Sequence, residues 1–345
     1  METATQTPTT ERLTIARAMA TALAGEMRHD PNVLVMGEDI AALGGVFGNT
    51  QGLLEEFGPE RVRDTPISET AFIGAAVGLA SVGMRPVVEL MFVDFFGVCM
   101  DAIYNLAAKN SYFSGGKMPV PMVLMTSVGG GYGDAGQHSQ CLYGTFAHLP
   151  GMKVVVPSNA YDAKGLMVAA IRDQNPVVFM YHKALQGMGW LGTEKGSVVD
   201  VPNDSYTVDI GSAAVVRKGN DVTLIGFGNT LHTALKAADR LAQEGIDAEV
   251  IDLRSLVPLD RDAIANSVTR TGNVVVVDDD YLSYGVSGEV ITVATERCFK
   301  SLQSAPARVA FPDVPIPFSP ALERPWLPSP EHVVTAVRQQ LGAGE

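Results

Sequence analysis

Cysteine is scarce in this chain of 345 residues, and the three that occur, Cys99, Cys141 and Cys298, lie far apart. They form no CxxC pair and no spacing typical of a zinc site. An odd, sparse set of cysteines is typical of a protein kept in a reducing compartment. We therefore expect a cytoplasmic protein.

Long apolar runs are also absent. The richest stretch, residues 87–106, is interrupted by Glu89, Asp94 and Asp101, whereas a membrane-spanning helix needs about 18–20 consecutive apolar residues. The first ten residues are polar and contain neither an apolar core nor an arginine, so they resemble no signal or transit peptide. We expect a soluble protein of bacterial-type cytoplasm with no membrane partner.

Basic residues are outnumbered by acidic ones. The chain has 25 Lys and Arg against 38 Asp and Glu, a net charge of −13 and a pI near 4.9. No basic stripe exists to neutralise phosphates, which argues against a nucleic-acid partner. The acidity is compatible with basic protein partners, but it is more often only a solubility feature.

Several common catalytic motifs are missing, among them GxSxG, the P-loop and HExxH. Gly226–Gly228 (GFG) follows an expected strand but lacks the third glycine of a dinucleotide fingerprint, so a tight turn is the better interpretation. Asp278–Asp280 suggests a cation site, yet consecutive residues at a strand end more often splay into solvent. We expect these three carboxylates to be exposed.

Apolar runs and helical spacing alternate along the rest of the chain. Strands are expected at 33–36, 86–92, 121–126, 153–157, 176–181, 222–227, 248–253, 274–278 and 307–311. Helices are expected at 14–28, 53–57, 94–110, 161–172, 230–244, 260–269, 286–300 and 331–341. This alternation predicts an α/β fold: a doubly wound, mostly parallel sheet, followed by a second, smaller α/β domain.

Composition divides the chain into four parts. Residues 1–11 are polar and are expected to be disordered, and residues 12–185 form the first domain. The character changes at residues 186–206, which are loop-like and predict an interdomain linker. The second domain then takes residues 207–345.

The stretch Asp64–Gly74 places one carboxylate, Glu69, at the mouth of an expected helix. Pro66 favours an extended approach, and Ser68 is a candidate N-cap. An acidic residue in a first turn either caps its own helix or serves a ligand, and local grounds favour the cap.

Three further candidates follow expected strands. Open α/β sheets bind ligands beyond the carboxyl ends of their strands, which is where Glu38, Phe95 and His138 are expected. Glu38 is equally compatible with a helix cap, whereas a residue such as Phe95 is more often part of a core than a platform for a cofactor. His138 lies in the polar loop Gly136–Gln140 (GQHSQ), where packing explains a histidine poorly, so a functional role is as good an interpretation.

Several short segments occur in the same order in a family of thiamine-dependent enzymes. They are Gly37–Asp39 (GED), Asp64–Glu69 (DTPISE), Gln137–Gln140 (QHSQ), Asp162–Gly165 (DAKG), Ala170–Asp173 (AIRD), Asn175–Val178 (NPVV) and Val314–Pro317 (VPIP). Together they resemble the β subunit of the thiamine-diphosphate-dependent 2-oxo acid dehydrogenase E1 component, over essentially all of residues 12–342. Within that family, residues 88–101 and 318–323 are more similar to acetoin dehydrogenase β subunits than to pyruvate ones.

The resemblance implies a transketolase-like pyrimidine-binding domain followed by a transketolase C-terminal-like domain. The family's motif for diphosphate and Mg²⁺, GDG followed by an asparagine, is missing; only Gly133–Gly136 (GDAG) comes near it, in the wrong context. The resemblance therefore implies that an α subunit holds the diphosphate and the Mg²⁺, in an α2β2 heterotetramer that shares thiamine diphosphate between its chains.

The implied reaction decarboxylates a 2-oxo acid or cleaves acetoin, and passes the acyl group to the lipoyl group of an E2 acyltransferase. Two alternatives stay open: an E2-independent acyloin or acyl transferase subunit, and a non-catalytic structural or binding subunit of such a complex. The presence of both Glu69 and His138 argues against the second. Nothing in the sequence chooses among pyruvate, branched-chain 2-oxo acids and acetoin.

The resemblance also implies roles for single residues. Glu69 matches the carboxylate that hydrogen-bonds the pyrimidine N1′ of the cofactor and favours its 4′-imino form, the base of the reaction. Glu38 matches a second acid at the same edge, suited to a proton relay between paired sites. Phe95 matches an aromatic residue packed by the aminopyrimidine ring, and His138 an active-site histidine near the substrate. A poorly solvated cleft with a raised pKa for Glu69 is expected.

A structural monovalent cation, usually potassium, is a further implication. The matching positions are Met122, Ala170, Ile171, Asp173 and Asn175. Most of them would act through backbone carbonyls, so their side chains say little. An ordinary helix C-terminus before Pro176 is an equally good interpretation.

The chain also departs from the common pattern of the family. Val98 stands where pyruvate-type relatives carry a glutamine, the linker contains Trp190, and the loop Gly129–Gly136 is rich in glycine and carries Asp134. All three features are expected to border the substrate channel. These departures leave the identity of the substrate open, but they do not change the expectation that the cofactor is thiamine diphosphate.

Overall fold

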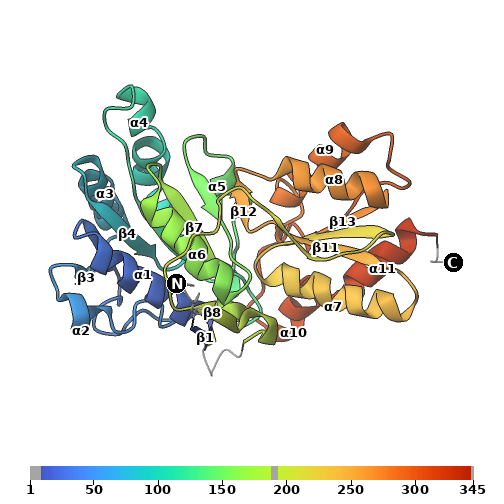
Figure 1. The fold of residues 1–345 in the computed structure, drawn as a ribbon, viewed down its shortest axis with the longest axis horizontal. Coiled ribbons are helices and arrows are strands. Elements are labelled where there is room, and N and C mark those ends of the chain that lie inside the picture. Colours follow the sequence, from blue (N-terminus) through green and yellow to red (C-terminus); the bar gives the residue numbers. More distant parts are fainter. Residues whose placement is uncertain (1–8, 188–192, 343–345) are drawn as a thin grey trace, which may run out of the picture.

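Two β-sheets covered by helices organise the computed structural model, which describes residues 9–187 and 193–342 (Figure 1). Most of the segment predicted to be disordered, residues 1–8, lies outside the described residues, as does Trp190 of the predicted linker. The predicted architecture, a mostly parallel sheet followed by a second, smaller α/β unit, is confirmed.

The first sheet has, within the described residues, seven strands in the order β12-β6-β7-β5-β4-β2-β3. Their bounds are β2 Val33–Gly37, β3 Val62–Asp64, β4 Arg85–Leu90, β5 Val123–Val128, β6 Lys153–Val155, β7 Val177–His182 and β12 Ser255–Val257. All pairs are parallel except β12 with β6. Most of these strands are buried apolar runs, as parallel strands covered on both faces require.

The second sheet follows the order β14-β13-β10-β11-β9. Its strands are β9 Ala214–Arg217, β10 Val222–Gly226, β11 Ala248–Asp252, β13 Val274–Tyr281 and β14 Ala307–Phe311. Only the pairing of β9 with β11 is antiparallel in this sheet. Although β12 comes from this half of the sequence, it pairs with β6 and so belongs to the first sheet.

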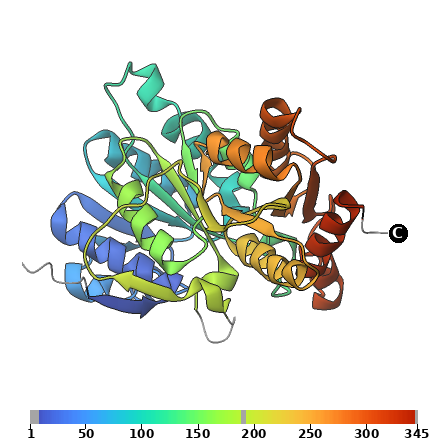
Figure 2. The same ribbon diagram turned by 45° about the vertical axis from the view of Figure 1, so that its right-hand side comes forward.

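Helices cover both faces of the first sheet. The helix α1 begins after Thr14, whose hydroxyl oxygen accepts a hydrogen bond from the backbone N–H of Arg17. It lies beside α6 on one face (Figure 2), and α3 packs on the other face. The bounds are α1 Ile15–His29, α2 Leu53–Phe57, α3 Glu69–Ser81, α4 Asn110–Phe113, α5 Tyr143–Ala147 and α6 Ala160–Arg172.

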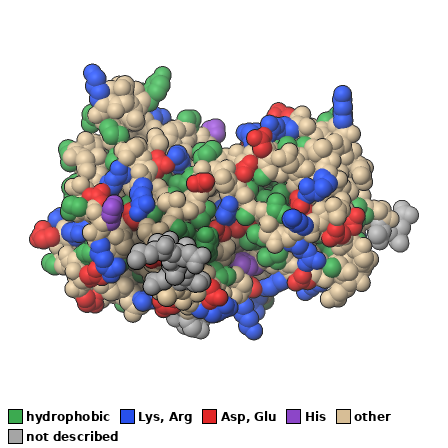
Figure 3. All heavy atoms as spheres, in the orientation of Figure 1, with side chains coloured by type: hydrophobic (Ala, Val, Ile, Leu, Met, Phe, Trp, Pro, Cys, Tyr) green, Lys and Arg blue, Asp and Glu red, His purple; other side chains and the backbone are tan. Residues whose placement is uncertain are grey.

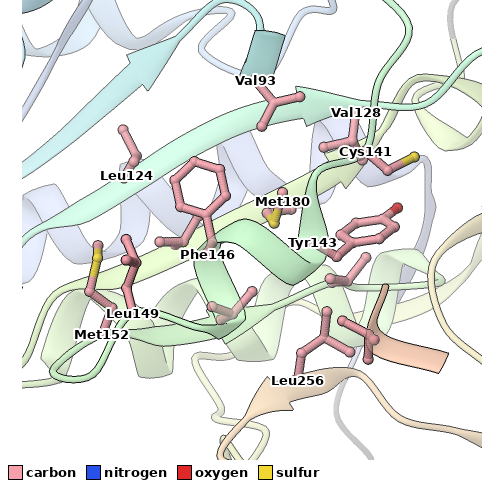
Figure 4. Packing of buried hydrophobic residues seen from close by; sticks show 14 of the residues in the cluster. Val93, Leu124, Val128, Cys141, Tyr143, Phe146, Leu149, Met152, Met180 and Leu256 are labelled. Atoms are coloured by element: carbon pink, nitrogen blue, oxygen red, sulfur yellow. The ribbon is translucent and has the colours of Figure 1, made fainter. Parts of the chain in front are cut away.

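The helices of the second half are α7 Asn229–Gln243, α8 Arg261–Thr271, α9 Val286–Cys298, α10 Pro320–Glu323 and α11 Pro330–Gln340. One hydrophobic cluster runs from the first sheet into this half. Tyr143 and Phe146 of α5 lie in it, and Leu256 of β12 packs beneath them (Figure 4). The two halves therefore share a continuous core.

The surface shows no concentration of one charge on the face drawn in Figure 3, where Lys and Arg are interspersed with Asp and Glu. None of the helices described is long and apolar enough to cross a membrane.

The prediction of one helix over residues 94–110 is wrong. The chain forms a 3₁₀ helix at Val93–Val98, a π-helical turn at Ala102–Ala107 and the short α4. Tertiary contacts explain the break: the Asp94 carboxylate accepts hydrogen bonds from Gln140, and the Thr70 hydroxyl donates to the carbonyl of Val98, at 2.6 Å. These contacts outweigh the helical spacing of the apolar residues.

Two other expectations also fail. Residues predicted to be disordered or loop-like form strands, because β1 (Thr10–Leu13) pairs antiparallel with β8 (Val199–Pro202). Asp278–Asp280 is buried and not splayed into solvent, since β13 continues through it and backbone N–H groups of Ser287 and Gly144 donate to the first and third carboxylates. No cluster of three metal-binding side chains occurs in the described ranges.

Candidate active site

The carboxyl ends of β2 and β3 lie side by side, because Gly37 pairs in register with Asp64. Glu38 follows β2 directly, and the segment after β3 leads into α3. The Asp64 carboxylate accepts a hydrogen bond from the backbone N–H of Ala41, at 2.7 Å. This contact ties the loop after Glu38 to the segment that carries Glu69.

Glu38 and Glu69 form a buried acidic pair at this edge, with only 7% and 8% of their surfaces exposed. Burial raises the pKa of Glu38, and the charges of Glu69 and Asp39 raise it further, against a smaller opposite effect of the Ser68 backbone N–H. The Oε1 atom of Glu38 is buried and has no hydrogen-bond partner in the described part of the chain. The pair therefore has hydrogen-bonding capacity to offer a ligand.

The predicted cap at Ser68 is confirmed in position but wrong in its chemistry. Ser68 occupies the N-cap position of α3, yet its hydroxyl makes no capping hydrogen bond. It donates instead to the carbonyl of Pro66, at 3.0 Å, which stabilises the turn before the helix.

His138 packs between two aromatic rings. Its imidazole lies 5.5 Å from the ring of Phe92 and 5.5 Å from that of Phe95, centroid to centroid, and meets both edge-to-face. Asp94, which precedes Phe95, accepts hydrogen bonds from the backbone and side-chain N–H groups of Gln140, at 3.2 and 3.0 Å. The loop carrying His138 is thus tied to the 3₁₀ helix carrying Phe95.

Contacts between α3 and the 3₁₀ helix Val93–Val98 bring the acidic pair of Glu38 and Glu69 close to Phe95. The Thr70 hydroxyl, next to Glu69, donates to the carbonyl of Val98. Burial and the charge of Glu69 together raise the pKa of the neighbouring Cys99 to about 12. Glu69 and the helix of Phe95 are therefore close neighbours at one edge of the sheet.

Two family models match the chain: "Transketolase, pyrimidine binding domain" over residues 11–187 and "Transketolase, C-terminal domain" over residues 211–333. The "Acetoin:2,6-dichlorophenolindophenol oxidoreductase subunit beta" of Bacillus subtilis (strain 168) is 44% identical over 342 residues, covering 96% of this chain and 97% of the relative. The chain belongs to the family of thiamine-diphosphate-dependent E1 β subunits.

Other members of the family are almost equally similar. The subunit of the same name from Cupriavidus necator is 43% identical over 344 residues, covering 97% of this chain and 99% of the relative. The "Pyruvate dehydrogenase E1 component subunit beta" of Bacillus subtilis (strain 168) is 42% identical over 330 residues, covering 96% and 99%. Differences this small do not separate acetoin from pyruvate subunits.

The fold has a solved counterpart. A structure titled "Split gene transketolase, inactive beta4 tetramer" matches with a TM-score of 0.76 and 25% sequence identity, over 97% of this chain and 100% of that one. The two-sheet architecture of this chain is therefore also found in a solved transketolase chain.

The five residues predicted to hold a monovalent cation lie near the amino ends of strands in the first sheet, whereas Glu69 lies near the carboxyl ends. Met122 precedes β5, and the others lie at or just after the end of α6. The guanidinium of Arg85 donates to the carbonyls of Ile171 and Asp173, at 2.8 and 2.9 Å. Backbone N–H groups also donate to the carbonyls of Met122 and Ala170. Four of the five predicted oxygen ligands thus already accept one hydrogen bond from the protein.

The carboxylate of Asp173 is also satisfied internally. Lys153 Nζ lies 2.5 Å from one of its oxygens, and the backbone and side chain of Asn175 donate to the other, both at 2.9 Å. Although burial opposes it, these hydrogen bonds lower the pKa of Asp173.

Two buried polar residues near His138, Lys183 and Glu323, were not singled out in the sequence. Lys183 follows β7 and is buried, and Glu323 of α10 accepts hydrogen bonds from the backbone N–H groups of Gly131 and Gly133, at 2.6 and 3.0 Å. The signal in the sequence was weak: a lysine after a strand normally extends into solvent, and Glu323 is remote in sequence from the loop it contacts.

Glu89 is a further buried acid, close to the edge that carries Glu38 and Glu69. It lies on β4 next to Gly37 of β2, and it accepts a hydrogen bond from the hydroxyl of Tyr181. Burial raises the pKa of Glu89 to about 7, while hydrogen bonds from Tyr181 and Asn49 lower it. At neutral pH this carboxyl group is partly protonated.

Of the three features expected to border the substrate channel, the structure describes Val98 and the loop Gly129–Gly136, whereas Trp190 lies outside the described residues. Gly136, at the end of the glycine-rich loop, lines an open cavity of about 570 Å³ together with Gln140, Tyr281 and Pro315. Val98 is exposed on the 3₁₀ helix beside α3.

Proposed function

We propose that this chain is the β half of an E1 enzyme that acts on a 2-oxo acid or on acetoin and works only with an α subunit. The observation that carries the proposal is the buried pair Glu38 and Glu69, at the same sheet edge as Phe95 and His138, with one carboxyl oxygen that no group in the described residues hydrogen-bonds. The sequence relatives, which are β subunits of such enzymes, support it.

The residues at this edge fit the pyrimidine half of thiamine diphosphate. Buried carboxyl groups suit the ring's polar nitrogens, and the partly exposed ring of Phe95 suits its flat face. When bound, the cofactor supplies a nucleophilic carbon that adds to the substrate carbonyl. In the proposed site Glu69 holds the proton shared with the pyrimidine N1′, and Glu38 serves as a second proton carrier.

His138 has the proposed role of proton transfer to the substrate, or of stabilising charge that develops on it. Its imidazole is partly exposed, and its orientation is limited by the rings of Phe92 and Phe95. Both features suit a catalytic group that must reach a substrate from a fixed direction.

The proposed assembly is an α2β2 heterotetramer in the cytoplasm. The α subunit would hold the diphosphate and Mg²⁺, because the corresponding motif is missing from this chain. An E2 acyltransferase would accept the acyl group on its lipoyl group. A potassium ion near Ala170 and Asn175 is part of the proposal, and it would use the second lone pairs of carbonyls that already accept one hydrogen bond.

Coexpression with the α partner tests this function. We expect the two chains to copurify, and thiamine diphosphate with Mg²⁺ to bind the complex tightly but the isolated β chain weakly. Turnover should then be measured with pyruvate, branched-chain 2-oxo acids and acetoin. Tight binding to the isolated chain would contradict the shared site, and absence of turnover on all three substrates would contradict the activity.

The acceptor needs its own assay. Reduction of a lipoyl domain is expected under the leading proposal, whereas an E2-independent transferase would form acyloin products without it. A complex that binds the cofactor yet catalyses neither reaction would support the alternative of a non-catalytic subunit.

A further inference from the structure

The loop that carries His138 has a backbone that needs support from outside. Gly129, Gly131 and Gly133 have φ values of +98°, +105° and +74°, and Ala135, which is not a glycine, has a φ of +61°. A residue with a side chain in this region is strained by about 1 kcal/mol or more. The three glycines adopt these φ values without strain, so Ala135 is the position where contacts from other elements must offset the cost.

Within the described residues, three charged side chains from three elements form hydrogen bonds with this loop. Glu323 of α10 accepts from two glycine N–H groups, and Asp94 accepts from Gln140 at the far end. Lys183, which follows β7, contacts the middle of the loop and His138 itself. Of the three supports, Lys183 is the one that touches the active-site histidine.

The contacts of Lys183 are unusual for a lysine. Its surface is only 2% exposed, and its ammonium donates to the backbone carbonyl of His138 and to the carboxylate of Asp134, at 3.1 Å in the latter case. The ammonium also lies 5.5 Å from the centroid of the Phe92 ring, which packs on the imidazole of His138. One cation thus contacts both the backbone of His138 and a ring that limits its rotation.

We propose that Lys183 is a positioning residue for His138. By donating a hydrogen bond to the backbone carbonyl of His138, it fixes the position and orientation of the imidazole. The role in turnover rests on the proposed function, because it requires His138 to act on the substrate. Without this ammonium, the His138 carbonyl and the Asp134 carboxylate lose their buried donor, and the strained loop relaxes. A shift of about 1 Å in a catalytic group can lower the rate by up to about 100-fold.

Lys164 provides a matched control. It is also buried, with 3% of its surface exposed, and its ammonium donates to the backbone carbonyls of Pro202 and Asn203, at 2.5 and 3.1 Å. It likewise lies over an aromatic ring, 5.5 Å from the centroid of Tyr206. Lys164 belongs to α6, and its hydrogen bonds within the described residues go to carbonyls outside the proposed site, so its loss reports the general effect of removing a buried lysine.

The experiment compares Lys183→Met with Lys164→Met in the complex with the α subunit, each alone and combined with His138→Ala. Lys183→Met is expected to lower kcat/KM by about 10- to 100-fold, while Lys164→Met lowers thermal stability with kcat/KM unchanged. In the His138→Ala background, Lys183→Met is expected to cause no further loss, because its effect passes through the histidine. An equal loss in both backgrounds overturns the proposal.

If Lys183→Met does not assemble with the α subunit, Lys183→Arg replaces it. Arginine keeps the charge, and the expected loss in kcat/KM is intermediate.

A second measurement is independent of catalysis. Diethyl pyrocarbonate modifies accessible imidazoles, and mass spectrometry of the peptide containing His138 gives its rate of modification. This rate is expected to change in Lys183→Met and to match wild type in Lys164→Met. If Lys183→Met leaves the modification rate of His138 unchanged, the positioning role is overturned, even if the complex is active. If the rate changes but the wild-type complex shows no turnover, the positioning role stands and the proposed function fails.

Discussion

His182 Nε2 lies 2.9 Å from the Oδ2 atom of Asp279, in a contact that joins the first sheet to the second. Both side chains are almost fully buried. The Nδ1 atom of His182 accepts a hydrogen bond from the backbone N–H of Ala184, so the ring proton of the neutral form is on Nε2, facing the carboxylate. The contact therefore links the end of β7, just before Lys183, to the second half of the chain.

Replacing Asp279 should weaken the junction between the halves. Asp279→Ala leaves the buried Nε2 of His182 without a partner, and we expect a loss of about 1–3 kcal/mol in the free energy of unfolding. Asp279→Asn keeps an acceptor oxygen and should lose less. Urea denaturation of the two variants checks the order, and equal stability of Asp279→Ala and wild type would contradict it.

Glu69→Gln should abolish most thiamine-dependent turnover. The amide keeps the size of the side chain but cannot share the proton with the pyrimidine nitrogen, and such proton-transfer groups contribute about 100- to 10,000-fold. Steady-state assays of the complex with the α subunit measure the loss. Glu55→Gln is the matched control, since Glu55 is also an acidic residue in the first turn of a helix but is exposed. Full turnover in Glu69→Gln would exclude the proposed role.

Glu89 should make stability fall as the pH rises. Burial raises its pKa from 4.5 to about 7 in the folded chain, so between these values the folded chain keeps a proton that the unfolded chain has lost. Its contribution to stability is full below about pH 4.5 and is lost as the pH rises through about 7. Glu89→Gln does not titrate and therefore avoids this pH-dependent loss, which is on the order of 3 kcal/mol.

The measurement compares urea unfolding of wild type and Glu89→Gln at pH 5 and pH 8. Other titrating groups are common to both proteins, so the difference between them isolates Glu89. We expect the variant to gain stability relative to wild type at the higher pH. Parallel behaviour of the two proteins would mean that Glu89 does not titrate in this range.

Local patterns predicted most of the fold for a physical reason. Buried parallel strands such as Val33–Gly37 are continuous apolar runs, and helices such as α1 combine a cap with regular spacing, so both are visible in short windows. The pairing of β1 with β8 joins residues almost 200 positions apart in the sequence, and no short window contains it. The break in the helix predicted over residues 94–110 has the same cause, because its decisive contacts come from Thr70 and Gln140.

The residues of the candidate site also fall into those that local sequence patterns reveal and those that they do not. Glu38, Glu69, Phe95 and His138 could be noticed because each follows a strand or opens a helix, whereas their roles were implied by the resemblance to the E1 β family. Lys183 could not be proposed, because its burial depends on Asp134 and on the carbonyl of His138, which approach it only in the folded chain. Long-range hydrogen bonds of buried charges are the part of a site that local patterns do not reveal.

Potassium should raise the thermal stability of the chain if the proposed cation site is occupied. Replacing about 100 mM choline chloride by potassium chloride keeps the ionic strength constant and should raise Tm by about 2–4 °C, as for a ligand that binds only the folded state. Differential scanning fluorimetry measures the shift. Identical Tm values in both salts would mean that Arg85 and the backbone donors satisfy these carbonyls without an ion.

Gly129→Ala should disrupt the contact between His182 and Asp279. A Cβ atom at Gly129 would lie 2.0 Å from His182 Nε2, and the φ of +98° adds backbone strain. Gly83 has nearly the same φ, +97°, but nothing within 4 Å of the position of its Cβ, so Gly83→Ala measures the strain alone. Strain at such positions is about 1–2 kcal/mol, and Gly129→Ala should lose clearly more in urea denaturation because the imidazole must also move. If the two variants were equally stable, the ring of His182 would be free to shift, and its contact with Asp279 would contribute little to the junction between the two sheets.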